Sequence, residues 1–359
     1  MEDVKENTGD SNYPNLIETI FEFDIPAGQK PERLDVFLTN SMKYATRNKV
    51  QKAIDDGCVW INGKVAKSSK KIKGLDKIIC KIMKSPPIEL TPENIPLEIV
   101  FEDESLLVIN KPKGMVTHPG YGNRKGTVVN AVLWHIGKRE AITIELDEDS
   151  DDEEIDEGRI FASDAVRPGI VHRLDKDTSG LLLITKDSSL HSILAKQFED
   201  RTIERYYFAL VWGDVKNDEG TWEGDIGRNP RNRKTFAVVK KDGKTAITDY
   251  WVMERYGFIT LVKVKLRTGR THQIRVHFSH NGYPVLGDKD YGGDTVVKGG
   301  GMPETRKIAE QCLQIAQRQM LHAKVLGFTH PLSSERMRFE SDLPEDFMEV
   351  LKILRKTLN

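Results

Sequence analysis

The segment 167–180 concentrates side chains suited to nucleophilic or acid–base chemistry. It reads Arg-Pro-Gly-Ile-Val-His-Arg-Leu-Asp-Lys-Asp-Thr-Ser-Gly, and Asp175 follows directly on the apolar Leu174. A carboxylate at the end of a buried strand is partly desolvated yet can still reach a substrate, as a nucleophile or a general base requires. The alternative is that Asp175 and Asp177 are ordinary turn residues that accept backbone hydrogen bonds. The pattern by itself leaves both interpretations open.

The elements around this segment predict the scaffold that positions it. Apolar runs at 169–174 and 180–186 read as strands on either side of the loop, and Ser188 is suited to cap a helix over 189–200. A further helix is expected over 271–281, where Gly282 ends it. Further strands are predicted at 98–101, 106–110, 206–212, 234–239, 245–255 and 259–267. We therefore expect an α+β fold with a large, mostly antiparallel sheet.

A small basic unit is predicted ahead of this region. Helical spacing over 32–38 and 47–56 is followed by a strand at 58–61, an Asn62-Gly63 hairpin turn and a last strand at 77–83. Residues 30–84 hold 14 Lys and Arg against 5 Asp and Glu, and such an excess is what phosphate neutralisation requires. A lysine-rich face that is merely solvated is the alternative. The candidate RNA contacts in this unit are Arg47, Lys49, Lys52, Lys64, Lys70 and Lys71.

Composition shifts divide the chain further. We expect an acidic, flexible segment over 1–29, the basic unit over 30–84, a linker with four prolines over 85–96, and a large domain over 97–359. Within that domain, residues 145–157 hold ten acids and no base, which predicts a disordered insertion over about 141–165. Without 1–24 and 145–157, 53 basic residues stand against 38 acidic ones. The total charge of −1 therefore does not exclude a nucleic-acid partner.

Other classes of function fit poorly. No apolar run is long enough for a membrane span, and the first ten residues lack the pattern of a secretory signal. Three widely spaced cysteines suit a reducing cytoplasm, where we expect the protein to act. His272, His277 and His280 have no acidic or Cys partner, so we expect no metal. The Gly-rich stretch 291–301 does not follow a strand and open a helix, so it is not a phosphate loop.

Two family resemblances sharpen these expectations. Arg33-Leu34-Asp35, Ile54-x-x-Gly57-x-Val59 and Asn62-Gly63-Lys64 resemble the alpha-L RNA-binding motif named after a small-subunit ribosomal protein. The segment 172–180 resembles the signature of the RluA/RluD family of pseudouridine synthases, within which the large-subunit ribosomal RluD type also carries an alpha-L unit. The other segments that match this family are 110–114, 116–120, 207–211, 267–277, 284–293, 319–323 and 328–331.

The resemblance implies a pseudouridine synthase fold with a large mixed, mostly antiparallel sheet, and an isomerase that converts uridine to pseudouridine. It implies Asp175 as the essential carboxylate, Arg275 as the cation beside it, and Tyr207 rather than Tyr206 as the tyrosine that stacks on the target base. It also implies that Arg173 fills the space left by the flipped-out base. Phosphate contacts are expected from Lys111, Arg228, Arg231, Arg233, Lys234 and Arg270. The alternative for Arg275 is a phosphate contact or a surface ion pair.

The reaction gains and loses no atoms, so we expect no cofactor. The expected partner is large-subunit ribosomal RNA or its precursor particle, modified by a monomer at one or several neighbouring uridines of a stem-loop, as part of ribosome biogenesis. Transfer RNA is an alternative substrate, and Asp175 attacks C1′ or removes a ribose proton. A catalytically silent assembly factor is a competing hypothesis, against which Asp175, Tyr207 and Arg275 argue by being present. A hydrolase using Asp175 and Asp177 lacks a second group that activates water.

Overall fold

A computed structural model describes residues 17–42, 47–67, 69–84, 88–119, 123, 125–144, 169–298 and 301–357. The chain divides into two compact units. Unit 1 takes the described residues up to Ile88 together with 143–144, and unit 2 takes the others. None of the described helices is long and apolar enough to cross a membrane.

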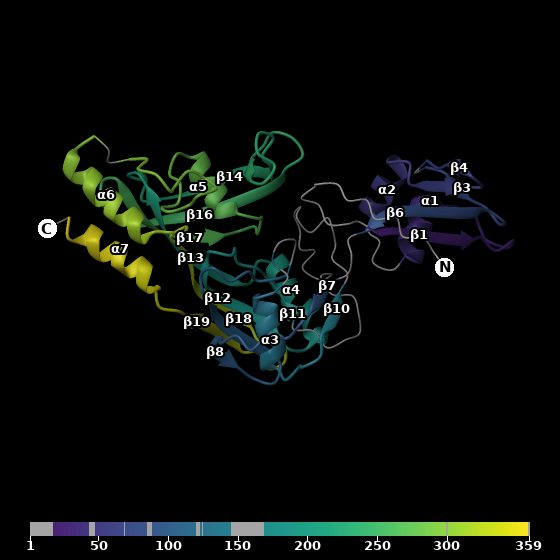
Figure 1. Cartoon of the computed structure of the whole chain (residues 1–359), viewed down its shortest axis with the longest axis horizontal. Coiled ribbons are helices and arrows are strands. Elements are labelled where there is room, and N and C mark those ends of the chain that lie inside the picture. Colours follow the sequence, from purple (N-terminus) through teal and green to yellow (C-terminus); the bar gives the residue numbers. More distant parts are fainter. Residues whose placement is uncertain are drawn as a thin grey trace. The chain divides into compact units, whose positions relative to one another are not determined.

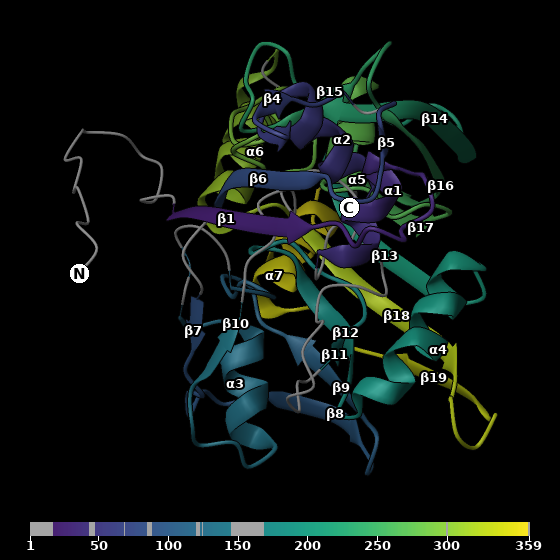
Figure 2. The ribbon, with the colours of Figure 1, turned by 90° about the vertical axis from the view of Figure 1, so that its right-hand side faces the viewer.

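Unit 1 packs two helices against a sheet of four strands within its described part (Figures 1 and 2). The helices are α1 (Leu34–Ser41) and α2 (Arg47–Asp55), close to the ranges that helical spacing predicts. The sheet order is β1-β6-β3-β4, with β3 (Val59–Ile61) and β4 (Lys64–Val65) joined by the expected turn. Asn62 and Gly63 have φ of 50° and 76°, the positive values that a type I′ hairpin turn needs.

The prediction of a flexible acidic segment over 1–29 is wrong for part of its length. Residues Ile17–Asp24 form β1, which pairs antiparallel along its whole length with β6 (Lys77–Lys84). Phe21 and Phe23 pack against the core of unit 1, and β1 lies beside β6 in Figure 2. The excess of acidic residues concealed an alternation of apolar and polar residues typical of a half-buried strand. Residues 1–16 lie outside the described part.

Unit 2 is built on a large mixed, mostly antiparallel sheet, which confirms the predicted fold class. Eleven strands of the described residues take part, nine of them in the order β15-β14-β16-β17-β13-β18-β12-β9-β8, while β11 pairs with β12 and β19 with β18. One pairing, β12 with β18, is parallel. The strands are β8 (Glu98–Glu102), β9 (Leu106–Lys111), β11 (Gly169–Ile170), β12 (Ser179–Thr185), β13 (Glu204–Trp212), β14 (Glu219–Arg228), β15 (Phe236–Val238), β16 (Lys244–Arg255), β17 (Ile259–Leu266), β18 (Leu321–Thr329) and β19 (Arg336–Glu340).

The helices of unit 2 cover separate parts of this sheet. The helices are α3 (Val128–His135), α4 (Ser188–Glu199), α5 (Gln273–His280), α6 (Pro303–Ile315) and α7 (Glu345–Arg355). α6 and α7 lie side by side at one end of the sheet (Figure 1), where Cys312 and Phe347 share a buried cluster with Leu210 and Trp212 of β13. These two helices and the strands β14, β18 and β19 were not predicted from the sequence.

Other boundaries differ from the predictions in smaller ways. The strand predicted at 169–174 is limited to β11, and the chain then enters an irregular loop over 171–178, called the Asp175 loop below. The proline-rich segment contains β7 (Ile88–Leu90), which pairs with β10 (Ile142–Ile144) from the start of the predicted insertion. The acidic run itself, 145–157, lies outside the described residues.

Candidate active site

Strand register brings the predicted residues into one row across the sheet. Gly180 of β12 pairs with Lys111 of β9 on one side and with Ala323 of β18 on the other. Tyr207 of β13 pairs with the same Ala323. Gly180 has φ of 117°, and a Cβ there would meet the carbonyl oxygen of Ala323 at 2.3 Å, so a glycine is needed where these strands approach. The Asp175 loop ends at this row.

Three side chains hold the Asp175 loop by its backbone carbonyl groups. Thr117 Oγ1 donates to Leu174 O at 2.8 Å, Lys111 Nζ to Lys176 O at 3.1 Å, and Arg318 Nη1 to Asp177 O at 2.9 Å. Within the loop, Thr178 N donates to Asp175 O at 3.1 Å. Because the donors come from separate parts of unit 2, the position of Asp175 depends on the packing of the whole unit.

Asp175 forms an ion pair with Arg275. Arg275 Nη1 lies 3.1 Å from Asp175 Oδ2, while the side chains are 4% and 19% exposed. Burial by itself raises the pKa of Asp175, but His272, which is charged only when it gains a proton in acid, and the permanent positive charges of Arg275 and Arg173 outweigh it, so the pKa lies below its usual value. Asp175 is therefore a carboxylate, partly open to solvent, that stays ionised at neutral pH. Such a group can attack an electrophilic carbon or accept a proton.

Arg275 is itself held from behind by two more carboxylates. Its Nε and Nη2 donate to Asp288 at 2.7 and 2.8 Å, and Nη2 also donates to Asp290 at 2.5 Å. Its guanidinium carbon lies 4.8 Å from the centre of the Tyr291 ring. Burial opposes the charge of Arg275, but the hydrogen bonds to Asp288 and the negative charges nearby raise its pKa well above the usual value. The guanidinium is therefore a fixed positive charge with little freedom to turn.

Tyr207 lies on the face of β13 opposite to that of Tyr206. Tyr207 is 5% exposed, and burial together with the nearby charge of Asp175 raises its pKa. The ring of Tyr206 instead lies 3.8 Å from Lys263 Nζ and 6.1 Å from the ring of Trp251. Of the two tyrosines, Tyr207 therefore has Asp175 among its neighbours, whereas the described partners of Tyr206 belong to the other sheet face.

The prediction that Lys111 contacts phosphate is wrong. Its side chain is fully buried, and Nζ donates to the carbonyl oxygens of Pro112, Met115 and Lys176 at 2.9, 2.9 and 3.1 Å. Burial lowers its pKa to about 7, against the opposing charges of Asp175 and Asp177. Three carbonyl acceptors match the three protons of an ammonium group. Lys111 therefore anchors the Asp175 loop and is unavailable to RNA.

The other residues of unit 2 that were predicted to contact RNA differ in exposure and in the contacts of their side chains. Arg173, Arg231, Arg233 and Lys234 are exposed. Arg228 lies 4.4 Å from the Phe236 ring and donates to Arg233 O, and Arg270 donates to Thr245 O at 3.2 Å.

The predicted contacts in unit 1 are mostly exposed. Lys52, Lys64, Lys70 and Lys71 are exposed, and the side chain of Lys49 lies outside the described part. Arg47 forms an ion pair with the fully buried Asp35 at 3.2 Å while its own side chain stays 56% exposed.

Several residues at the site were not predicted as functional. Asp288 and Tyr291 belong to the motif 284–293 that carries the family resemblance, so their signal was present in the sequence. Arg318 and Asp346 had no such signal. Arg318 Nε and Nη2 contact Asp346 at 2.8 and 3.0 Å, and this pair ties α7 to the Asp175 loop.

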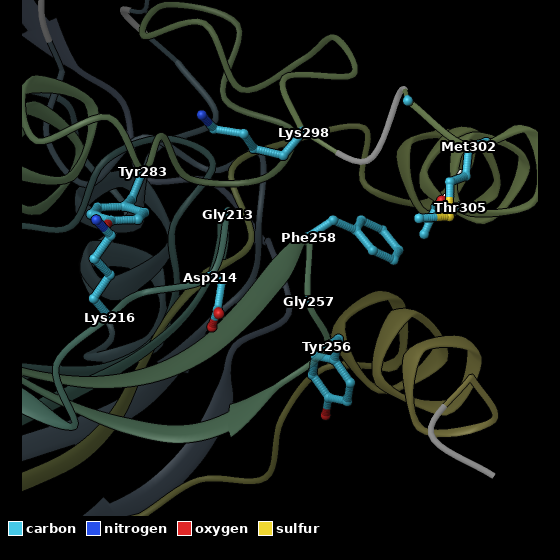
Figure 3. Close-up of a pocket in the computed structure, with 11 residues that line it drawn as sticks. Gly213, Asp214, Lys216, Tyr256, Gly257, Phe258, Tyr283, Lys298, Met302 and Thr305 are labelled. Atoms are coloured by element: carbon cyan, nitrogen blue, oxygen red, sulfur yellow. Dashed lines mark hydrogen bonds between the residues drawn. The ribbon is translucent and has the colours of Figure 1, made fainter.

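A separate cavity lies at the far end of β13, beyond Trp212. Its volume is about 580 Å³, and Asp214, Lys216, Phe258, Tyr283, Lys298 and Met302 are among its lining residues (Figure 3). None of the residues predicted for the active site lines it. The residues predicted for the active site therefore lie elsewhere in unit 2.

Comparisons with known proteins identify the family of this chain. Residues 105–280 match the family model described as RNA pseudouridylate synthase, and residues 32–80 match the S4 domain. An uncharacterized RNA pseudouridine synthase of Chlorobaculum parvum is 43% identical over 93% of this chain and 98% of its own length. The ribosomal large subunit pseudouridine synthase D of Pseudomonas aeruginosa is 36% identical, over 93% and 95%. The solved human RNA pseudouridylate synthase domain containing 4 covers 72% of this chain and 93% of its own, with 22% identity and a TM-score of 0.51, and supports the fold.

Proposed function

The chain belongs to the RNA pseudouridylate synthase family, and on that premise we propose that it modifies uridines of large-subunit ribosomal RNA with Asp175 as the essential carboxylate. Three relatives at 36–39% identity are named ribosomal large subunit pseudouridine synthase D. The S4 unit, with its exposed lysines, supports an RNA substrate. We further propose that the reaction accompanies ribosome assembly in the cytoplasm.

The observation that carries the proposal is the ion pair of Asp175 with Arg275. In the reaction, the C1′–N1 bond breaks, the uracil turns, and a bond forms from C1′ to C5, after which C5 loses a proton and N1 gains one. An ionised carboxylate at this point serves either by attacking C1′ or by removing a ribose proton. The positive charge of Arg275 favours the ionised form of Asp175, so that this carboxylate is free to attack C1′ or to accept a proton.

Tyr207 and Arg173 complete the proposed site. The buried Tyr207 beside Asp175 is suited to stack on the target base and to assist the late loss of the C5 proton. Arg173 is exposed two residues before Asp175, where it is suited to fill the space of a base that has left its stem-loop. Arg228, Arg231, Arg233 and Arg270 are proposed phosphate contacts on unit 2.

The decisive experiment maps pseudouridine across ribosomal and transfer RNA of a strain that lacks this protein. The strain carries no copy, the wild type, Asp175→Asn or the matched control Asp177→Asn. We expect one or a few neighbouring large-subunit uridines to lose the modification without the protein. Wild type and Asp177→Asn should restore it, and Asp175→Asn should not. Restoration by Asp175→Asn would overturn the assignment, and loss confined to transfer RNA would overturn the substrate.

A second experiment tests RNA binding by unit 1. Replacing the exposed Lys64, Lys70 and Lys71 with Gln should weaken RNA binding and reduce the slope of log affinity against log salt by about 2 to 3. The control replaces three exposed lysines, Lys307 on α6, Lys352 on α7 and Lys356 directly after α7, and should leave the slope unchanged. Equal slopes for both triple variants would show that unit 1 does not contact phosphate through these lysines.

A further inference from the structure

His272 has an unusual backbone conformation immediately before α5. Its φ of 56° and ψ of 19° lie in the left-handed region, which residues other than glycine rarely adopt. A residue at the start of a helix usually has extended geometry and caps the helix with its side chain. His272 has neither feature: its backbone is left-handed, and its side chain makes no capping hydrogen bond. Its conformation therefore calls for an explanation other than the start of α5.

The ring of His272 points toward Asp175. Its Nε2 lies 3.9 Å from Asp175 Oδ2, and the side chains of His272 and Asp175 are 21% and 19% exposed. This distance is too long for a direct hydrogen bond and leaves Nε2 free to bind a third atom beside the carboxylate. Substrate that reaches Asp175 therefore passes close to Nε2 of His272.

The other ring nitrogen is bonded to Tyr291. His272 Nδ1 lies 2.8 Å from the Tyr291 hydroxyl oxygen, which also accepts a hydrogen bond from Phe236 N at 3.1 Å. Burial raises the pKa of Tyr291, so the hydroxyl keeps its proton. Within the described residues these are the two hydrogen bonds of that hydroxyl, and its proton therefore points to Nδ1. The neutral imidazole must then carry its own proton on Nε2.

We propose that His272 is a further catalytic residue, whose Nε2–H donates a hydrogen bond to a uracil carbonyl oxygen of the target nucleotide. This inference rests on the proposed function. When the C1′–N1 bond breaks, its electron pair goes to the uracil and spreads onto the carbonyl oxygens. A donor held in place beside Asp175 stabilises that charge without giving up its proton. Tyr291 contacts both residues: the face of its ring packs against the guanidinium of Arg275, and its hydroxyl selects the tautomer of His272.

The charged groups around the imidazole agree with a neutral donor. Burial lowers the pKa of His272, the charge of Asp175 opposes this, and Arg275 adds to the lowering. Asp288 and Asp290 also oppose it, but the net direction is downward. At neutral pH the ring is therefore uncharged, and its donor depends on the tautomer that Tyr291 selects.

The first test is spectroscopic and needs no activity. In protein labelled with nitrogen-15 in histidine, the signal of His272 is assigned by its loss in His272→Asn. We expect a protonated Nε2 and an unprotonated Nδ1 at neutral pH. A protonated Nδ1 would overturn the inference. The measurement is independent of whether ribosomal RNA is the substrate.

The second test measures single-turnover conversion of uridine in the RNA identified by the mapping experiment. Asn tolerates the left-handed conformation, so His272→Asn should fold and bind RNA normally while converting uridine about tenfold more slowly. The matched control is His280→Asn, on the exposed last turn of α5, which should match wild type. If the wild type converts no uridine in this RNA, the proposed function fails. If wild type and His272→Asn convert it equally fast, the role of His272 fails alone.

Tyr291→Phe separates a tautomer role from a structural one. Without the hydroxyl, the neutral imidazole can carry its proton on either nitrogen, whereas the protonated imidazole always carries one on Nε2. The loss of rate should therefore be roughly threefold at neutral pH, shrink as the pH falls and the imidazole gains a proton, and vanish in the His272→Asn background. A loss that stays the same as the pH is lowered, or that persists in that background, would contradict the selection of a tautomer by Tyr291.

Discussion

Arg275 Nη1 lies 3.1 Å from Asp175 Oδ2, although the two residues are 100 positions apart in the sequence. Asp288 and Asp290 hold the same guanidinium from its other edge. The contact therefore depends on the start of α5, the segment after it and the Asp175 loop all being in place. The pKa of Asp175 is therefore lowered only when unit 2 is folded and Arg275 lies beside it.

Replacing Arg275 with Lys should lower activity and shift its pH dependence. A single ammonium group cannot bind three carboxylates, so we expect a loss of about 100-fold in turnover. Arg275 lowers the pKa of Asp175, so its loss should move the acidic limb of the pH–rate profile to higher pH. Arg267→Lys is the control, because Arg267 is half-exposed and pairs with a different carboxylate, that of Asp249. An unshifted acidic limb would show that Arg275 does not set the ionisation of Asp175.

Replacing Lys111 with Met should impair conversion without changing electrostatic RNA binding. The substitution leaves the carbonyl groups of Pro112, Met115 and Lys176 without their donor, and the Asp175 loop should shift. A displacement of about 1 Å is enough to cost roughly 100-fold in rate. The salt dependence of RNA binding should equal that of wild type and of the exposed control Lys125→Met. A reduced salt slope for Lys111→Met would instead indicate a phosphate contact.

Replacing Asp346 of α7 with Asn should lower both the stability of unit 2 and its activity. Asp346 is 8% exposed and pairs with Arg318, which in turn donates to Asp177 O. Neutralising it leaves a buried guanidinium uncompensated, which should reduce the free energy of unfolding by about 3 kcal/mol. Activity should fall at temperatures where the variant remains folded. The neighbouring Glu345→Gln, which is exposed, should change neither quantity, and full activity of folded Asp346→Asn would show that α7 does not influence the loop.

Unit 1 should lose stability in acid through Asp35. This fully buried carboxylate accepts hydrogen bonds from Arg33, Gln51 and Arg47, and chiefly the bond from Arg33 lowers its pKa far below the ordinary value of 3.8. A lowered pKa means that the contribution to stability is complete above about pH 4 and is lost as the pH falls further.

Hydrogen exchange measures this effect locally. In wild type, amide protection of α1 and α2 should decline as the pH falls below about 4, after correction for the intrinsic exchange rate. In Asp35→Asn, protection should already be low at neutral pH and should vary less with acid. The same dependence on acid in both proteins would show that Asp35 is not the group responsible.

Elements that depend on signals within a few neighbouring residues were predicted well from the sequence. The Asn62-Gly63 turn, α2 and β16 lie close to their predicted ranges because turn residues, helical spacing and alternation act over a few positions. β1 was not predicted, because an excess of acidic residues is also typical of a disordered segment. α6 and α7 pack on β13 from distant parts of the chain, and their amphipathic patterns were not recognised.

The sequence by itself determined the family, the fold class and the motif that contains Asp175, because long ordered motifs and local periodicity are properties of the chain. Tertiary structure decided what surrounds that carboxylate. Strand order placed Tyr207 and Gly180 on either side of Ala323, buried Lys111 beneath the Asp175 loop, and brought His272 beside Asp175. These relationships join segments far apart in the sequence. Burial, ionisation and hydrogen-bond partners depend on distances that exist only once those segments have packed together.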